Sequence, residues 1–293
     1  MSTRIALLTG RTMPLDVPED DLLVRALADR GLTADVLPWD EPADWSAYGL
    51  ALVRTTWDYW QRHEEFLAAL REIGGRTKLR NPVGLVAWNS HKGYLLELAA
   101  AGVPVLPTRL VPAGADPERR AAALAAFGTD AALVVKPAVS VGARDTIRTT
   151  AGDPAAAAHL AELVGSGRDT LVQPLAESVL TRGETSLVFL GGSFSHAVRK
   201  SAAPGDYRIH QYLGGTVHPH DPSGAELAAA EAALAAAPHG GQLEYARVDL
   251  VLDAAGDPCL MELELIEPEL FLFQQDAAPA ARYAARIEAL LAD

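Results

Sequence analysis

The chain has 293 residues, of which 49% are apolar and 22% charged, a composition typical of a globular enzyme. Its net charge of −13 argues against nonspecific binding to nucleic acid or to an anionic membrane. Cys259 is the single cysteine, which excludes an intrachain disulfide. No run approaches the ~20 apolar residues of a membrane span, and the N-terminus lacks the apolar core of a signal peptide, so a cytoplasmic protein is expected.

The first 85 residues alternate between strand and helix patterns. Apolar runs at 5–8, 34–37 and 50–53 predict strands, and helical periodicity appears at 20–30 and 66–73. This βαβ succession predicts a small parallel sheet, in which ligands bind where the strands end. Thr9-Gly10 and Arg54-Thr55-Thr56 occupy such positions. There is no G-x-G-x-x-G sequence, so a dinucleotide site is not expected.

The rest of the chain mixes helices with further strands. A helix is predicted to open at 89–92 and to run to about 101, where Gly102 ends it. Further predicted helices are an Ala-rich one at 154–164, one at 225–237 and a terminal one from about 279. Further predicted strands are 133–135, 170–173, 185–190 and 194–199.

Residues 245–253 and 258–265 predict a β-hairpin around a four-residue loop that contains Gly256. If Asp253 faces Pro258 across that loop, one face of the hairpin is charged and the other is apolar. The apolar face, expected in the core, is Ala246, Val248, Leu250 and Leu252 against Cys259, Met261, Leu263 and Leu265.

The charged face of this hairpin carries three carboxylates and one guanidinium. Asp249 is expected directly opposite Glu262, and Arg247 opposite Glu264. Like charges opposite each other destabilise a sheet, so these carboxylates need a cation. Oxygen ligands without His or Cys favour a hard ion such as Mg²⁺. A solvated outer face is the alternative.

Two lysines lie where an anion could be bound. Lys136 follows the strand at 133–135, and a buried lysine at a strand end is costly unless an anion meets it. Small residues in the next loop, Ser140 and Gly142 among them, let backbone N–H groups approach phosphate oxygens. An ordinary hairpin loop is the alternative there. Lys92 lies near a predicted helix start, where an exposed surface lysine is the alternative.

Gln173-Pro174-Leu175 resembles a strand that passes from one lobe to another. Pro174 lacks a backbone donor, which leaves neighbouring carbonyl and N–H groups free for a ligand. Glu184 begins the next strand, and its carboxylate could accept hydrogen bonds from a sugar hydroxyl or be solvated.

Basic residues gather between 199 and 208. Arg199, Lys200 and Arg208 surround a Gly-flanked strand, which suits a polyanionic ligand. A rim of surface salt bridges is the competing interpretation. His218 and His220 lack a third partner in the sequence, so a metal site is not expected there.

Taken in order, these segments resemble the ATP-grasp superfamily from about residue 81 to 273. The resemblance implies an α/β (α+β) fold in which two α+β lobes enclose a nucleotide after a Rossmann-like N-terminal domain. It implies domain boundaries at 1–85 for the substrate-side N-terminal domain, 86–175 for the central ATP-grasp subdomain and 176–293 for the C-terminal subdomain with the metal site.

The resemblance also implies roles for individual residues. The ATP-binding residues are Lys92, Lys136, Ser140, Gly142, Gln173, Pro174, Leu175 and Glu184. Arg247 and Arg208 would be catalytic, because they would stabilise the transferring phosphoryl group. Mg²⁺ would be held by Asp249, Glu262 and Glu264, although the superfamily usually has Asn at the last of these positions.

Two segments look closest to the cycloserine synthetase-like subgroup, whose enzymes close a ring within an amino-acid derivative. They are Arg54-Thr-Thr-Trp57-Asp58-Tyr59 and Glu264-Leu-Ile-Glu267-Pro-Glu269-Leu. Similarity to glutathione synthetase and to ribosomal-protein glutamate ligases is also present, in Gly205-Asp206-Tyr207-Arg208. The expected substrate residues are Arg54, Trp57, Asp58, Tyr59, Arg199, Lys200 and Glu267, with Arg54 meeting a substrate carboxylate.

We therefore expect an ATP- and Mg²⁺-dependent ligase that forms an amide-type C–N bond through an acyl phosphate, either between two molecules or within one. The expected partner is a small amino-acid-like substrate rather than nucleic acid or a membrane, and a homodimer is compatible with the sequence. The alternatives are a nucleotide-binding regulatory protein or phosphotransferase without ligase activity, and a purely structural module.

Overall fold

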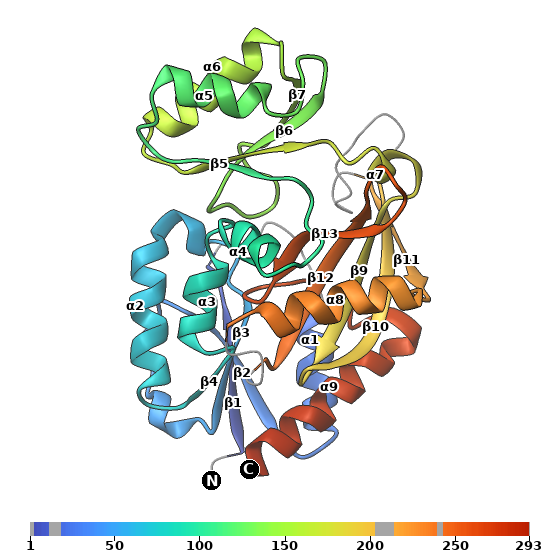
Figure 1. Cartoon of the computed structure of the whole chain (residues 1–293). Coiled ribbons are helices and arrows are strands. Elements are labelled where there is room, and N and C mark those ends of the chain that lie inside the picture. Colours follow the sequence, from blue (N-terminus) through green and yellow to red (C-terminus); the bar gives the residue numbers. More distant parts are fainter. Residues whose placement is uncertain (1–2, 12–18, 203–213, 239–242, 293) are drawn as a thin grey trace.

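The structure is a computed structural model that describes residues 3–11, 19–202, 214–238 and 243–292. Its strands form three sheets, which succeed one another along the sequence (Figure 1). The mixed α/β class expected from the sequence is confirmed. The domain boundaries at 85 and 175 stay a prediction.

The N-terminal sheet consists of four parallel strands in the order β2-β1-β3-β4. These strands are β1 (Arg4–Thr9), β2 (Thr33–Pro38), β3 (Leu50–Thr55) and β4 (Lys78–Arg80). They are joined through α1 (Glu19–Ala28), η1 (Trp45–Ala47), η2 (Tyr59–Arg62) and α2 (His63–Gly74). The central strand β3 is buried along its whole length, as its continuous apolar run requires in a sheet covered on both faces. The predicted parallel sheet is confirmed, whereas its Rossmann-like type stays a prediction.

A small antiparallel sheet follows, in the order β5-β8-β6-β7. Its strands are β5 (Arg109–Val111), β6 (Ala132–Pro137), β7 (Ile147–Thr150) and β8 (Thr170–Pro174). Two helices, α5 (Pro117–Ala125) and α6 (Pro154–Gly165), pack against it through one apolar cluster. Each helix begins after an Asp that caps it, Asp116 or Asp153, with Pro in the first turn.

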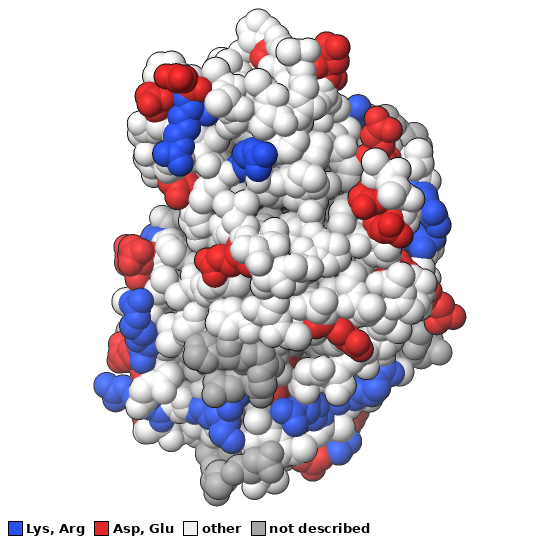
Figure 2. All heavy atoms as spheres, in the orientation of Figure 1, with Lys and Arg blue, Asp and Glu red and all other residues white. Residues whose placement is uncertain are grey.

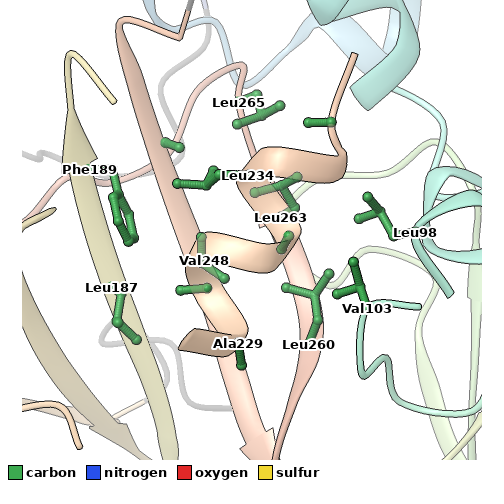
Figure 3. Close-up of a cluster of buried hydrophobic side chains, with 14 of the residues drawn as sticks. Leu98, Val103, Leu187, Phe189, Ala229, Leu234, Val248, Leu260, Leu263 and Leu265 are labelled. Atoms are coloured by element: carbon green, nitrogen blue, oxygen red, sulfur yellow. The ribbon is translucent and has the colours of Figure 1, made fainter. Parts of the chain in front are cut away.

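The largest sheet is antiparallel, in the order β11-β10-β9-β12-β13. Its strands are β9 (Glu184–Leu190), β10 (Ser193–Ser201), β11 (Thr216–His220), β12 (Tyr245–Leu252) and β13 (Pro258–Glu264), with the short helix α7 (Ser178–Thr181) before β9. Helix α8 (Gly224–Ala236) covers one face, where Leu234 lies near Val248 and Leu263 of the hairpin (Figure 3). Helix α9 (Gln274–Ala292) packs with α1 in the cluster on the other face. Within the described ranges, no helix is both long and apolar enough to cross a membrane.

The helix predicted from 89 to 101 begins later, as α4 (Tyr94–Ala100), and it is preceded by a helix that the sequence did not predict, α3 (Val83–Asn89). Between them, the backbone N–H of Lys92 donates to the Ala138 carbonyl at 2.8 Å, and that of Gly93 donates to His91 Nδ1 at 3.1 Å. These donors are therefore not used within a continuous helix. The terminal helix also begins earlier than predicted, at 274 rather than about 279.

The predicted register of the hairpin is confirmed at its charged end and is wrong at its loop. Arg247 faces Glu264 and Asp249 faces Glu262, as expected. A bulge follows Asp249, so that Leu252 rather than Asp253 faces Pro258. The bulge also changes which side chains of β13 face the core cluster. Leu260 packs in that cluster, whereas Cys259 and Met261, predicted to be there, belong to a separate small cluster, and Met261 lines a cavity.

Arg54, the predicted partner of a substrate carboxylate, is instead fully buried inside the fold. Its Nη2 lies 2.8 Å from Glu19 Oε2, and its Nε lies 3.3 Å from Asp20 Oδ1. The Glu19 carboxylate also accepts the backbone N–H groups of Leu270 and Leu272, at 2.9 and 3.0 Å. This ion pair therefore ties α1 and β3 to the segment that follows the hairpin, and the substrate role predicted for Arg54 is wrong.

We expect Arg54→Met to destabilise the fold by about 3–5 kcal/mol, because it leaves two buried carboxylates without their cation. The matched control is Arg30→Met. It removes a surface arginine paired with Glu288 and should cost only about 0–1 kcal/mol. Urea unfolding followed by circular dichroism measures both changes, and equal losses would contradict a structural role specific to Arg54.

Glu244 is a second buried acid, 1% exposed, that pairs with Arg286 at 3.2 Å. Burial raises the pKa of Glu244 from 4.5 to about 7 against the opposing effect of Arg286. The folded protein therefore keeps this proton at pH values where the unfolded chain has lost it. The free energy of unfolding should consequently fall as the pH rises from 4.5 to 7.

Glu244→Gln should remove this part of the pH dependence. Between pH 5 and 7, the wild type should lose about 1–3 kcal/mol of unfolding free energy relative to the variant. Urea unfolding of both proteins at intervals of pH measures the difference. Two parallel curves would contradict a raised pKa at Glu244.

Candidate active site

Acidic and basic side chains are interspersed over the face of the molecule seen in Figure 2, whereas one cavity gathers many charged groups. This cavity has a volume of about 600 Å³. All three sheets or their connecting loops contribute to its wall, for example through Trp57, Lys136 and Glu262. Its apolar part is formed by Leu106, Val134, Leu175, Ala176, Val179 and Met261.

Side chains from α3 and α4 hold the outer edge of the hairpin in its position beside the cavity. Asn89 Nδ2 donates to the Leu263 carbonyl at 2.8 Å, and Asn89 Oδ1 accepts the Leu265 N–H at 2.9 Å. The hydroxyl of Tyr94 accepts the Leu263 N–H at 2.9 Å. These contacts satisfy backbone groups that an edge strand would otherwise leave unpaired. Strand β13 is thereby fixed beside the turn that carries Lys92.

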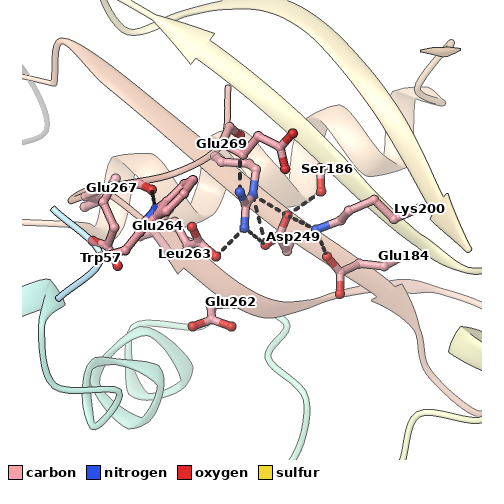
Figure 4. Close-up of polar contacts among 12 residues, drawn as sticks. Trp57, Glu184, Ser186, Lys200, Asp249, Glu262, Leu263, Glu264, Glu267 and Glu269 are labelled. Atoms are coloured by element: carbon pink, nitrogen blue, oxygen red, sulfur yellow. Dashed lines mark hydrogen bonds and ion pairs between the residues drawn. The ribbon is translucent and has the colours of Figure 1, made fainter. Parts of the chain in front are cut away.

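Arg247 is the centre of the charged face. Figure 4 shows Asp249, Lys200 and Glu184 side by side on this face. Its Nε lies 3.0 Å from Asp249 Oδ1, its Nη2 lies 3.0 Å from Asp249 Oδ2, and Nη2 also donates to Glu264. Its Nη1 donates to the Glu269 carbonyl at 3.2 Å. Burial opposes the ionisation of Asp249, but Arg247 and Lys200 hold the pKa of that carboxyl below its ordinary value.

Lys200 joins two acids on neighbouring strands. It forms an ion pair with Glu184, and its Nζ lies 3.4 Å from Asp249 Oδ1. Ser186, on the same strand as Glu184, donates to the same Asp249 oxygen. Glu184 is completely buried, and burial raises its pKa to about 8 against the opposing effect of Lys200.

Lys92 and Lys136 both line the cavity but differ in their contacts. Lys92 Nζ lies 3.2 Å from Glu262 Oε1 and donates to the Ser140 carbonyl at 2.7 Å. Lys136 has no hydrogen-bond or ion-pair partner among the residues that the structure describes. Burial lowers the pKa of Lys136, as expected for a cation whose counter-charge is not in contact with it.

Beyond the hairpin, the segment from 264 to 269 forms an acidic wall, which we define as Glu264, Glu267 and Glu269. Burial, together with nearby carboxylates, raises the pKa of Glu267 to about 8, and burial raises those of Glu264 and Glu269 to about 7. Arg247 binds Glu264, but the carboxylates of Glu267 and Glu269 have no hydrogen-bond or ion-pair partner in the described part of the chain. The wall therefore has room for a cationic group of a ligand.

The N-terminal sheet contributes Trp57, Asp58 and Tyr59 to the cavity. Trp57 Nε1 donates to the Glu267 carbonyl at 2.9 Å, which fixes the backbone of the acidic wall. Asp58 Oδ1 accepts Trp39 Nε1 at 2.8 Å, so its carboxylate orients the loop as well as lining the cavity. Gly10 is required beside it, because a Cβ at that position would lie 2.5 Å from Asp58 Oδ1.

The structure brings most of the predicted site residues to this one cavity. Those that line it are Lys92, Lys136, Ser140, Gly142, Gln173, Pro174, Leu175, Glu184, Arg247, Asp249, Glu262, Glu264, Trp57, Asp58, Tyr59, Lys200 and Glu267. Arg54 and Arg199 do not line it. Arg199 Nη2 instead lies 3.3 Å from His220 Nε2, because adjacent strand residues point to opposite faces and Lys200 is the one that faces the cavity. Arg208 lies outside the described residues.

Comparisons with known proteins show the family of the chain. Residues 5–81 match the family model of the D-cycloserine synthetase DcsG N-terminal domain. Over 285 residues, the chain is 37% identical to the cycloserine biosynthesis protein DcsG of Streptomyces lavendulae, covering 94% of this chain and 95% of that protein. The chain belongs to the D-cycloserine synthetase family of ATP-grasp ligases. It is an ATP-dependent carbon–nitrogen ligase.

Solved structures show the same relationship. The crystal structure of D-cycloserine synthetase DcsG is 36% identical, with a TM-score of 0.84 over 98% of this chain and 99% of that one. An ATP-grasp RimK domain protein from Sphaerobacter thermophilus is 22% identical, with a TM-score of 0.68 over 97% and 98% of the two chains. D-alanine–D-alanine ligase from Bacillus anthracis, complexed with ATP, is 14% identical, with a TM-score of 0.66 over 99% and 97%. The latter two share the ATP-grasp fold with this member of the cycloserine synthetase family.

Sequence reasoning did not identify every residue of the site. Glu269 could have been found, because it follows Glu267 by two residues in an acidic segment. Ser186 and Asn89 gave no such signal, since their roles depend on contacts across strands and with a distant hairpin. Met261 was placed in the core because a bulge cannot be read from strand alternation.

The donor set suits a hard divalent cation, because Asp249, Glu262 and Glu264 supply only oxygen atoms and all line one cavity. In the described residues, however, no three carboxylate, His or Cys side chains are grouped as metal ligands. Each of the three carboxylates is instead in contact with Lys92, Lys200 or Arg247. The residues therefore fit Mg²⁺ in chemistry, and they would have to exchange partners to hold it.

We expect Asp249→Asn and Glu262→Gln each to lower Mg²⁺-dependent ADP formation roughly 100-fold or more, because each removes a charge that would hold the metal. Asp257→Asn is the matched control, since it makes the same change on the exposed loop of the same hairpin. ADP release is measured with a coupled assay, and thermal unfolding shows whether each variant folds. Wild-type rates in both folded site variants would contradict the metal assignment.

Proposed function

We propose that this ligase closes a ring within a small amino-acid derivative. A carboxylate oxygen of the substrate attacks the γ-phosphorus of ATP, which forms an acyl phosphate and releases ADP. A nitrogen of the same molecule then attacks the acyl carbon, forms the C–N bond, expels inorganic phosphate and loses a proton. Both steps gather negative charge, so fixed cations should provide most of the stabilisation.

Residues of the cavity supply these cations. Lys92 and Lys136 would neutralise the phosphates of the nucleotide, and Arg247 would stabilise the transferring phosphoryl group. The apolar wall beside Gln173, Pro174 and Leu175 suits a purine ring. Asp249, Glu262 and Glu264 would hold Mg²⁺, which supplies charge neutralisation at the phosphates when bound.

The substrate class follows from the acidic wall, which is the observation that carries this proposal. Glu267 and Glu269 have no cationic partner in the described part of the chain, and they line the same cavity as Trp57 and Tyr59. Two such carboxylates, with aromatic faces beside them, suit an ammonium group. Membership of the D-cycloserine synthetase family supports an amino-acid derivative as the molecule that carries this group. An already tethered amine makes the second step effectively unimolecular.

The test is a screen of ADP release over amino acids and their aminooxy and ureido derivatives, in both enantiomers, with the product identified by mass spectrometry. We expect an aminooxy or ureido amino acid to stimulate ADP release and to give a cyclic product. ADP release only with two separate substrates would contradict ring closure. Binding of ATP without ADP release in the presence of any of these compounds would favour a regulatory nucleotide-binding protein instead.

Glu267→Gln and Glu269→Gln should each raise the KM for the amino-acid substrate roughly tenfold or more, because a charge-assisted contact to the ammonium group is lost. The KM for ATP should change much less. Glu97→Gln is the control, since Glu97 on α4 accepts a hydrogen bond from Trp88 on α3 and does not line the cavity. Steady-state kinetics with each substrate varied in turn measures these constants. An increase confined to the KM for ATP would contradict the assignment.

A further inference from the structure

The carboxylates that would hold Mg²⁺ are already paired with cations of the protein. Glu262 pairs with Lys92, whereas Asp249 and Glu264 share Arg247. The Lys92–Glu262 pair is largely buried, since the two side chains are 12% and 22% exposed. Salt and water screen such a pair much less than a surface pair. A metal ion that binds Glu262 must therefore displace an ammonium group held 3.2 Å away.

Lys92 has a second partner, outside the hairpin, that can remain when Glu262 is lost. Its Nζ donates to the Ser140 carbonyl at 2.7 Å, and Ser140 belongs to the loop between β6 and β7. The backbone N–H of Lys92 is also held, by Ala138 of the same loop. The base of the side chain is thus fixed beside this loop, whose small residues would cover the phosphates. A polyphosphate there offers Lys92 more negative charge than one carboxylate does.

Lys136 provides the contrast, because it lines the same cavity without an ion-pair partner in the described residues. A nucleotide would find Lys136 already available, but it would have to draw Lys92 away from Glu262. That exchange would leave the Glu262 carboxylate without its cation, in a place where an unpaired charge is costly. Metal binding at Glu262 would remove this cost.

We propose that Lys92 couples metal binding to nucleotide binding. In the nucleotide-free enzyme Lys92 pairs with Glu262, and when nucleotide phosphates replace Glu262 as its partner, the carboxylate is released to bind the metal. Lys92 then acts as a positioning residue for the metal site in addition to contacting the nucleotide. This inference rests on the proposed use of ATP and Mg²⁺. By reciprocity, Mg²⁺ and nucleotide must each raise the affinity of the enzyme for the other by the same factor.

The experiment compares Lys92→Gln with the control Lys136→Gln. The control also removes one positive charge from the cavity, but it breaks no ion pair among the described residues. Binding of Mn²⁺ alone, without nucleotide, is followed by the electron paramagnetic resonance signal of the free ion. The Lys92→Gln variant should bind Mn²⁺ at least tenfold more tightly than either the wild type or Lys136→Gln. Equal affinities in the two variants would overturn the proposal, as would tight binding of Mn²⁺ by the wild type.

A second measurement uses the affinity for ADP with and without Mg²⁺, determined by equilibrium dialysis. The wild type should show a roughly 5- to 150-fold increase with Mg²⁺, and Lys92→Gln should show a several-fold smaller increase. An undiminished increase in a folded Lys92→Gln variant would overturn the coupling role. A wild type that binds no nucleotide at all would contradict the proposed function instead, while the Mn²⁺ comparison would still decide the role of Lys92.

Discussion

The structure depends on the charge balance of one antiparallel hairpin. Three carboxylates and one arginine share a largely buried face, and Lys92 and Lys200 from other elements complete the balance. Such a face is stable only if every charge has a partner, because an unpaired buried charge costs several kcal/mol. The same requirement makes the site reactive, since its cations and carboxylates can exchange protein partners for phosphates and metal.

Holding this face in place requires anchors from the rest of the chain. Asn81 donates to the Tyr245 and Leu265 carbonyls and accepts the Glu244 N–H. The Tyr245 hydroxyl, which has one proton to donate, lies within hydrogen-bond distance of the Val53 and Ile266 carbonyl oxygens. Glu19, paired with Arg54 in a buried ion pair, also accepts the Leu270 N–H and so fixes the segment that follows the hairpin. The N-terminal sheet therefore contributes to the site in two ways, by supplying Trp57 and Tyr59 and by fixing the backbone of the acidic wall.

Part of this arrangement follows from the sequence, because strand alternation places Arg247, Asp249, Glu262 and Glu264 on one face of the hairpin. The pairing of Asp249 with Glu262 also needed a loop register, and the bulge after Asp249 compensates for the one-residue difference at the loop. What sequence could not provide depends on long-range contacts. Arg54 follows the predicted strand at 50–53, as a ligand residue would, yet it lies within β3 and is neutralised by Glu19 and Asp20 from a distant helix. Arg199 and Lys200 are both basic neighbours on one strand, but their side chains point to opposite faces, and only that of Lys200 lines the cavity. The bulge that turns Met261 toward the cavity cannot be predicted from the alternation of apolar and polar residues.

The central claim is that the cations of this cavity support the transfer of a phosphoryl group to a substrate carboxylate. It is tested most directly with a substrate that supports ADP release and carries ¹⁸O in its carboxylate. Passage through an acyl phosphate predicts that one ¹⁸O atom per turnover appears in inorganic phosphate, as detected by mass spectrometry. Phosphate without ¹⁸O, formed together with the ligated product, would contradict it.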